Sequence, residues 1–247
     1  MSRLLLVTDL DNTLVGDDGA LQRFNGWFKQ HRQTYGSKLV YATGRSLKSY
    51  QRLTTQIALL EADILIASVG SEIYYPGYKL DEAWSSLSSL DWNRAGIVAI
   101  TQQFPQLILQ SESEQRPFKL SFVLHKEDAF ILPELQAQLI IQGIEAELIY
   151  SNDHDLDIMR RKVNKGSALT YICRAPRFAA KQIVVCGDSG NDIALFAVNK
   201  LGIIVGNART ELLQWHQDNL EDDRYLAQAN YAGGIIEGLK HFGIMHE

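Results

Sequence analysis

Short apolar segments alternate with longer amphipathic segments along this chain, and this alternation constrains the fold more than any other feature. The apolar segments are runs of four or five residues, at 4–8, 39–42, 64–68, 183–186 and 201–205. Continuous apolar runs are typical of strands that are buried on both faces of a sheet. The intervening segments have helical spacing and lie near 20–33, 46–60, 166–174, 192–197 and 210–217. Strands that alternate with helices predict a parallel sheet covered by helices on both faces.

The middle of the chain, from about residue 84 to 159, has a different pattern. Every second residue from Phe118 to Leu124 is apolar, and Lys119 and Ser121 fall between them on the opposite face. The same alternation is found at 145–151 and 155–159, and helical spacing at 93–103 and 128–142. One covered face and one open face predict an antiparallel sheet with helices on its back.

The two patterns together predict a second domain inserted into the first. We expect a discontinuous core domain at 1–82 and 160–247 and an inserted domain at 83–159. A chain of 247 residues has room for one large domain or two smaller ones. Within the insertion, the polar stretch 110–116 is predicted to be a solvated loop.

Charge and cysteine content exclude several classes of protein. Subtracting Asp+Glu from Lys+Arg gives 24 − 29 = −5, which disfavours a broad surface for nucleic acid or anionic membrane. No apolar run approaches the ~18 residues of a membrane span. The two cysteines lie in no metal-binding spacing, so a disulfide scaffold or structural zinc is disfavoured. We expect a cytoplasmic protein that binds or transforms a small molecule.

Two carboxylates follow the first predicted strand, in the segment Asp9-Leu10-Asp11-Asn12-Thr13. Ligands of open α/β sheets bind at the carboxyl ends of the strands. There, one carboxylate can act as nucleophile or metal ligand and the other as general acid and base. The alternative is a capped turn, in which Asp and Asn side chains accept hydrogen bonds from loop amides.

Two further segments suit an anion. The segment 43–45 (TGR) ends the second predicted strand and offers a hydroxyl, a backbone amide and the start of a helix. Lys165, between Asn164 and Gly166, opens a later helix and can supply a fixed positive charge. The alternatives are a helix N-cap for the first segment and a solvated lysine for the second.

The segment 187–192 (GDSGND) follows the predicted strand at 183–186 and offers two acids and an amide. Hard oxygen ligands of this kind suit magnesium. The alternatives are a Gly/Asp turn or a fragment of a calcium-binding loop, although the acid spacing of a calcium loop is absent. All four motifs are expected at one edge of one sheet, where together they supply what phosphoryl transfer needs.

In order and context, these four motifs resemble those of the haloacid dehalogenase superfamily of phosphatases. The resemblance implies a Rossmann-like parallel-sheet α/β core of the haloacid dehalogenase type, which carries the catalytic residues. It also implies that the inserted α+β domain corresponds to a type-two cap, which closes over the core and supplies substrate contacts. The cofactor implied is Mg²⁺.

A narrower similarity, to the sucrose-phosphate phosphatases of cyanobacteria and plants, rests on the segments DLDNTLVGD, YATGRS, SVGSEIYY and CGDSGND. It implies magnesium-dependent hydrolysis of sucrose 6-phosphate to sucrose and phosphate, the last step of sucrose synthesis, through an aspartyl-phosphate. One alternative is a phosphatase of another sugar phosphate, such as trehalose 6-phosphate or mannosyl-3-phosphoglycerate. An alternative of another class is a non-catalytic regulator that accepts a phosphoryl group.

The resemblance assigns a role to each motif residue. Asp9 is expected to attack phosphorus, and Asp11 to protonate the departing sugar oxygen and later to activate water. The catalytic set it implies is Asp9, Asp11, Thr43 and Lys165. The metal set it implies is Asp9, Asp11 through its backbone carbonyl, Asp188 and Asp192.

Substrate contacts are expected from residues near the motifs and from the open face of the inserted sheet. The expected set is Thr43, Gly44, Arg45, Glu72, Lys119, Asn164, Lys165 and Asn191. Asp155 and Asp157 are assigned instead to a polar strand face near the hinge. The expected partner is a phosphorylated disaccharide, with neither nucleic acid nor membrane. We also expect a monomer, and a sucrose-phosphate synthase is the one protein partner considered.

Overall fold

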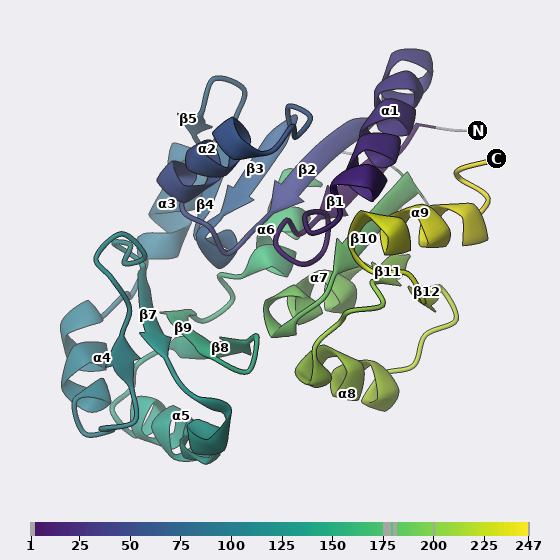
Figure 1. The fold of residues 1–247 in the computed structure, drawn as a ribbon. Coiled ribbons are helices and arrows are strands. Elements are labelled where there is room, and N and C mark those ends of the chain that lie inside the picture. Colours follow the sequence, from purple (N-terminus) through teal and green to yellow (C-terminus); the bar gives the residue numbers. More distant parts are fainter. Residues whose placement is uncertain (1–2, 175–178, 180–181, 200, 247) are drawn as a thin grey trace.

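The large sheet of the molecule follows the alternation in the sequence. A computed structural model describes residues 3–174, 179, 182–199 and 201–246. Within them, one sheet has eight strands in the order β12-β11-β10-β1-β2-β3-β4-β5 (Figure 1). The strands are β1 (Leu5–Thr8), β2 (Lys38–Ala42), β3 (Ile64–Ala67), β4 (Glu72–Tyr75), β5 (Lys79–Leu80), β10 (Ile183–Gly187), β11 (Gly202–Ile204) and β12 (Arg224–Leu226). The strands from β12 to β3 are parallel, and β4 and β5 form an antiparallel edge.

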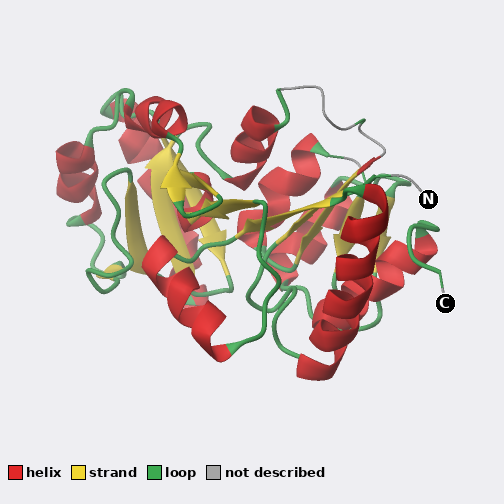
Figure 2. Ribbon diagram, turned by 90° about the horizontal axis from the view of Figure 1, so that it is seen from above, coloured by secondary structure: helices red, strands yellow, loops and turns green. Residues whose placement is uncertain are grey.

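Helices cover both faces of this sheet (Figure 2). One face packs against α1 (Asp18–Tyr35), α2 (Leu47–Gln56) and α9 (Tyr231–His241). The other packs against α3 (Glu82–Ser89), α6 (Lys165–Ile172), α7 (Ile193–Val198) and α8 (Thr210–Asp218). The α/β class expected from the alternation is confirmed.

The central strands are apolar along most of their length because both of their faces are buried. In β1, Leu6 packs against the first helical layer and Leu5 and Val7 against the second. In β2, Leu39 and Val40 divide in the same way. Because successive side chains of a strand point to opposite faces, a strand between two helical layers has no solvated position in its middle.

A smaller unit has a four-stranded antiparallel sheet in the order β6-β7-β9-β8. Its strands are β6 (Ile108–Leu109), β7 (Lys119–Val123), β8 (Ala146–Ser151) and β9 (Asp155–Arg160), and its helices are α4 (Arg94–Thr101) and α5 (Leu132–Ile141). The two helices share a core with Leu120 and Phe122, so they cover one face, as the period of two predicts. The domain boundaries at 83 and 159 stay a prediction.

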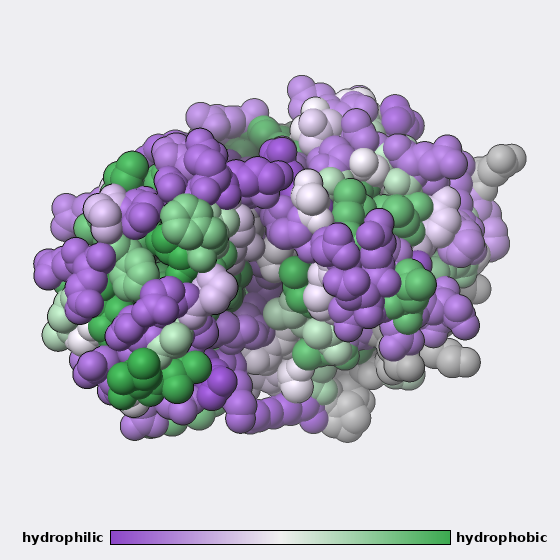
Figure 3. All heavy atoms as spheres, turned by 90° about the horizontal axis from the view of Figure 1, so that it is seen from below, coloured by the Kyte–Doolittle hydropathy of each residue, from purple (hydrophilic) through white to green (hydrophobic). Residues whose placement is uncertain are grey.

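Short 3₁₀ helices connect several of these elements: η1 (Ser68–Gly70), η2 (Lys126–Ile131) and η4 (Gly190–Asp192). Seen from below, a hollow separates two lobes, and the left lobe belongs to the smaller unit (Figure 3). Hydrophobic side chains on that lobe appear as separate spots among hydrophilic ones (Figure 3). Among the described residues, none of the helices has both the length and the apolar character to cross a bilayer.

Candidate active site

Three neighbouring parallel strands bring the motif residues to one edge of the large sheet. Because β10, β1 and β2 are adjacent, Asp9 after β1, Thr43 after β2 and Asp188 after β10 lie at the same edge. Lys165 opens α6, and its side chain reaches the same place. Asp9, Thr43, Lys165 and Asp188 are all buried.

Lys165 lies at the centre of this cluster. Its Nζ donates to Oδ1 of Asp9 at 2.8 Å and to Oδ1 of Asp192 at 2.7 Å, and its side chain is fully buried. Burial by itself would lower the pKa of Lys165, but attraction to Asp192 and Asp9 outweighs burial and raises that pKa. Lys165 therefore stays charged without contact with water, which excludes the solvated lysine that the sequence left open.

Asp192 ties Lys165 to the loop that follows β10. While its Oδ1 accepts from Lys165, its Oδ2 accepts from the backbone N–H of Asp188 at 3.0 Å and of Ser189 at 3.2 Å. Both oxygens of Asp192 are thus engaged by this chain. The geometry favours a bracing role for Asp192, and its expected place as a metal ligand stays a prediction.

The two carboxylate oxygens of Asp188 differ in their contacts. Thr13 donates its hydroxyl proton to Oδ1 of Asp188 at 2.5 Å, and Oδ2 is buried without a hydrogen-bond partner among the described residues. Burial and the charge of Asp192 raise the pKa of Asp188 to about 7, and burial raises the pKa of Asp9 well above its usual value.

These oxygens form a group that fits a divalent cation. Ligand atoms of Asp9, Asp188 and Asp192 lie within 4.8 Å of one another. A buried oxygen without a partner is costly, and hard oxygen ligands near one another are what Mg²⁺ requires. The donors therefore fit the predicted cofactor. The side chain of Asp11 lies outside this group, so any contribution from Asp11 to the metal rests on its backbone carbonyl, as expected above.

Asp11 forms a bidentate pair with Arg45. Nε of Arg45 donates to Oδ2 of Asp11 and Nη2 to Oδ1, both at 2.7 Å, and Nη1 donates to Oγ of Ser49 at 3.0 Å. The backbone N–H of Arg45 also donates to Oγ1 of Thr43, at 3.1 Å. The segment at 43–45 is therefore linked to the loop after β1 and does not act only as a helix cap.

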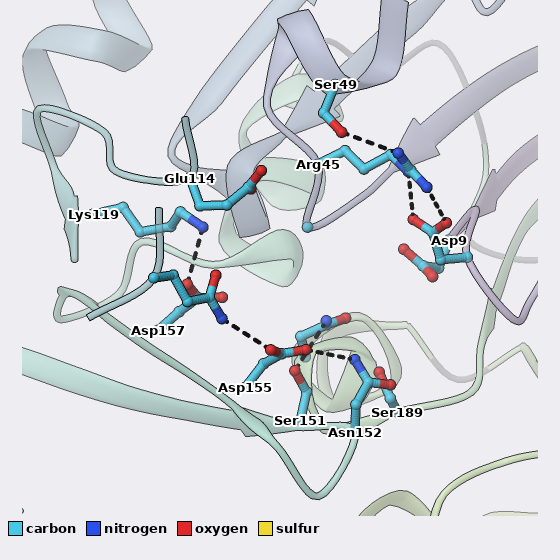
Figure 4. A pocket seen from close by; sticks show the side chains of 14 residues that line it. Asp9, Arg45, Ser49, Glu114, Lys119, Ser151, Asn152, Asp155, Asp157 and Ser189 are labelled. Atoms are coloured by element: carbon cyan, nitrogen blue, oxygen red, sulfur yellow. Dashed lines mark hydrogen bonds and ion pairs between the residues drawn. The ribbon is translucent and has the colours of Figure 1, made fainter. Parts of the chain in front are cut away.

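A cavity of about 300 Å³ opens beside these residues, between the large sheet and the smaller unit. Its lining is polar and comes from both units (Figure 4). The core supplies Asp9, Asp11, Gly44, Arg45, Ser49, Ser189 and Asn191. The smaller unit supplies Gln110, Glu114, Lys119, Ser151, Asn152, Asp155 and Asp157. A polar cleft of this kind, next to an acidic cluster and a buried lysine, suits a hydroxyl-rich phosphate ester.

The wall formed by the smaller unit is a hydrogen-bonded network. Nζ of Lys119 donates to Oδ1 of Asp157 at 2.9 Å, and Oγ of Ser121 donates to the same oxygen at 2.6 Å. Gln110 donates to Oδ1 of Asp155 at 2.9 Å. The open strand face predicted around Lys119 is thus this wall, and it includes Asp155 and Asp157, which the sequence assigned only to a polar face near the hinge.

Four residues expected to contact substrate are not among those that line the cavity: Thr43, Glu72, Asn164 and Lys165. Thr43 and Lys165 belong to the buried cluster described above, whereas Glu72 and Asn164 have other contacts. Glu72 accepts from Oγ of Ser68 at 3.1 Å and lies 3.8 Å from Nε of Arg116. Asn164 is the N-cap of α6, where its side chain accepts from the backbone N–H of Ser167. Their placement gives no support to sugar binding, and that role stays a prediction.

Besides Asp155 and Asp157, six lining residues have no role predicted from the sequence: Ser49, Gln110, Glu114, Ser151, Asn152 and Ser189. The stretch 110–116 was expected to be a solvated loop, but Gln110 and Glu114 turn into the cavity. The signal available was the alternation of acids in Asp155 and Asp157 on the strand that pairs with Lys119. Polar side chains on the open face of a sheet need hydrogen-bond partners when they are buried, and the neighbouring loop supplies them here.

Comparison with known proteins matches nearly the whole chain. The model of the sucrose-6F-phosphate phosphohydrolase family matches residues 2–243. A probable sucrose-phosphatase 2 of Arabidopsis thaliana is 38% identical over 252 residues, which are 97% of this chain and 60% of that protein. The chain therefore spans about 60% of the length of the plant relatives it matches. A mannosylfructose-phosphate phosphatase of Agrobacterium fabrum is 35% identical over 97% of each chain.

Solved structures of related proteins are also similar to this chain. The X-ray structure of the sucrose-phosphatase from Synechocystis, in complex with sucrose and phosphate, has a TM-score of 0.93 and 39% identity, and covers 100% of both chains. A haloacid dehalogenase-like hydrolase from Bacillus subtilis has a TM-score of 0.67 and 16% identity, and covers 99% of this chain and 93% of that chain. At that identity the likeness concerns the fold alone, and it agrees with the fold class expected from the four motifs.

Proposed function

This chain belongs to the sucrose-6F-phosphate phosphohydrolase family, and from that premise we propose that it hydrolyses sucrose 6-phosphate to sucrose and phosphate. The observation that carries the proposal is the buried pair of Asp9 and Lys165, at 2.8 Å, of which Asp9 lines a polar cavity. The X-ray structure of the similar sucrose-phosphatase, which holds sucrose and phosphate, supports the choice of sugar.

Asp9 is the proposed nucleophile. Its carboxylate attacks phosphorus, the bond from phosphorus to the sugar oxygen breaks, and an aspartyl-phosphate forms. Lys165 holds Oδ1 of Asp9 and supplies a fixed positive charge beside the incoming phosphoryl group. A divalent cation held by Asp9 and Asp188 would add Lewis-acid stabilisation of the phosphoryl oxygens.

Asp11 is the proposed general acid and base. It lines the cavity beside Asp9, so it can give a proton to the departing sugar oxygen and later take one from the attacking water. Both of its oxygens are engaged by Arg45, so proton transfer requires the release of at least one of these hydrogen bonds. Arg45 lines the same cavity and is therefore placed to turn toward the phosphoryl group.

Removal of divalent cations is expected to reduce turnover by at least about 100-fold, because Lewis-acid stabilisation by a metal is worth several kcal/mol. Phosphate release measured after dialysis against EDTA, and again after addition of Mg²⁺, checks this. Asp188→Asn should weaken Mg²⁺ binding in calorimetry, since it removes the charge of the acid whose buried Oδ2 has no hydrogen-bond partner in the described part of the chain. Full turnover without a divalent cation would contradict the metal site.

The sugar is tested by phosphate release across a panel of phosphate esters. We expect kcat/KM for sucrose 6-phosphate to exceed that for trehalose 6-phosphate, mannosyl-3-phosphoglycerate and glucose 6-phosphate by at least about tenfold, as hydrogen-bonding sites discriminate between hydroxyl patterns. A preference for any of these three would overturn the sucrose assignment and leave the phosphatase proposal intact.

Mannosylfructose phosphate is the second candidate substrate and belongs in the same panel. The mannosylfructose-phosphate phosphatase covers 97% of both chains at 35% identity, close to the identity of the plant relatives. A higher kcat/KM for mannosylfructose phosphate than for sucrose 6-phosphate would favour this candidate. Accumulation of a stable phosphoprotein without phosphate release would instead favour a non-catalytic regulator.

A further inference from the structure

One carboxylate oxygen joins the two walls of the cavity. Glu211 lies in the first turn of α8, outside the residues that line the cavity. Its Oε1 accepts from the backbone N–H of Asn152, in the hairpin between β8 and β9, at 2.9 Å. The same Oε1 accepts from the backbone N–H of Gly190, in the loop after β10, at 3.2 Å. Glu211 thus binds the smaller unit and the loop of Asp188 and Asp192 at once.

A backbone hydrogen bond fixes the start of α8, the helix that carries Glu211. The N–H of Arg209, the N-cap of α8, donates to the carbonyl oxygen of Asp188 at 2.7 Å. The start of α8 is therefore anchored to the loop of the proposed metal site. Oε2 of Glu211 is buried and has no hydrogen-bond partner among the described residues, so the contact rests on Oε1 alone.

The hairpin approaches the core more closely than side chains allow. A Cβ built on Gly190 would lie 2.1 Å from the carbonyl oxygen of Tyr150, so only glycine fits between the loop and β8. Asn191 adds a long contact, with Nδ2 3.4 Å from Oγ of Ser151. Backbone lies against backbone here, and the carboxylate of Glu211 holds the two together.

The hairpin carries part of the cavity wall with it. Nδ2 of Asn152 donates to Oδ2 of Asp155 at 3.2 Å, and Gln110 donates to Oδ1 of Asp155 at 2.9 Å. Asn152 and Asp155 line the cavity (Figure 4), and so does Gln110. A contact that fixes the backbone of Asn152 therefore fixes the position of this polar network relative to Asp9.

We propose that Glu211 is a positioning residue for sugar recognition, which sets the separation between the polar wall of the smaller unit and the catalytic floor. This proposal rests on the proposed phosphatase function. The two hydrogen bonds need an acceptor oxygen at the position of Oε1 and do not need the negative charge. Glutamine keeps that oxygen, whereas alanine removes it and aspartate withdraws it by one methylene group.

The test compares a phosphorylated disaccharide with p-nitrophenyl phosphate, which has no sugar to contact the polar wall. In Glu211→Ala we expect KM for sucrose 6-phosphate to rise about tenfold, the factor for loss of one ordinary hydrogen bond between the displaced polar wall and the sugar. We expect kcat/KM for p-nitrophenyl phosphate to stay within about threefold, because Asp9 and Lys165 keep their contacts. Glu211→Gln should restore KM for sucrose 6-phosphate and leave kcat/KM for p-nitrophenyl phosphate unchanged.

A matched control lies on the same helix. Gln214 is exposed and its side chain hydrogen-bonds only to Asp218 among the described residues, so Gln214→Ala should behave as the unsubstituted protein does. Should Glu211→Ala fail to fold, Glu211→Asp gives the same comparison with the charge at the start of α8 retained. An equal loss on both substrates, or no change in KM for the sugar phosphate, would overturn the proposal.

Amide hydrogen exchange tests the contact of Glu211 without any substrate. The backbone amides of Asn152 and Gly190 should exchange faster in Glu211→Ala than in the unsubstituted protein, and glutamine should restore their protection. If no sugar phosphate is hydrolysed but this pattern appears, the proposed function fails and the positioning contact stands. Unchanged protection of both amides would overturn the contact itself.

Discussion

Asp9→Asn is expected to lower kcat by at least about 10³-fold, because removal of a nucleophile abolishes the covalent route that the other residues assist. The asparagine side chain keeps an oxygen for Nζ of Lys165, which now donates to Oδ1 of Asp9 at 2.8 Å. The variant should therefore fold, and its loss should appear in the chemical step. Steady-state phosphate release at saturating Mg²⁺ measures it.

Trapping of the intermediate separates this role from a role in binding. Rapid acid quenching should recover a phosphoprotein from the unsubstituted protein and none from Asp9→Asn. Asp18→Asn is the matched control, since Asp18 is an exposed acid in the first turn of α1 and should leave kcat within about twofold. If Asp9→Asn retained more than a few per cent of the activity, Asp9 would not be the nucleophile.

The edge of the large sheet that carries the four motifs could be predicted from the sequence, because it follows from patterns among neighbouring residues. The apolar run of β1 leads directly into Asp9, and parallel strands with helices between them must bring their carboxyl ends to one edge. The period of two around Lys119 likewise reports which face of the smaller sheet is covered. What local spacing encodes is the identity of each element and the face that it buries.

The side-chain contacts of the site could not be predicted, because they join residues that lie far apart in the chain. The pairs of Asp11 with Arg45 and of Gln110 with Asp155 join residues separated by more than 30 positions. The oxygen of Glu211 that links Asn152 to Gly190 has no signature in the sequence around it. The antiparallel edge formed by β4 and β5 was also missed, because β4 begins with Glu72 and is only partly buried, so it lacks the continuous apolar run of the central strands, and β5 has only two residues.

Lys165→Met is expected to destabilise the protein by about 3–5 kcal/mol, because it leaves buried carboxylates without their cation. The side chains of Lys165 and Asp192 are 0% exposed and that of Asp9 is 7% exposed, so water cannot take over the role of the ammonium group. Urea denaturation followed by circular dichroism measures the loss. Lys165→Met should also lack measurable turnover.

The pH dependence of that loss identifies its cause. Burial already raises the pKa of Asp9 above 3.8 and attraction to Lys165 opposes the rise, so removal of Lys165 raises this pKa further. A carboxyl with a higher pKa in the folded state binds more protons there than in the unfolded state, so the stability of the variant falls as pH rises. The deficit of Lys165→Met should therefore shrink as the pH is lowered from 7 toward about 4.

Lys165→Met leaves two buried carboxylates, those of Asp9 and Asp192, without a cation. Adding Asp192→Asn to this variant removes one of the two negative charges. The double variant should regain part of the lost stability at pH 7, because one fewer buried carboxylate is left unpaired, yet it should remain without turnover. The asparagine oxygen can still accept from the N–H groups of Asp188 and Ser189, which hold the loop in place. A deficit that is unchanged by pH and by Asp192→Asn would mean that Lys165 stabilises the fold by packing, not by compensating buried charge.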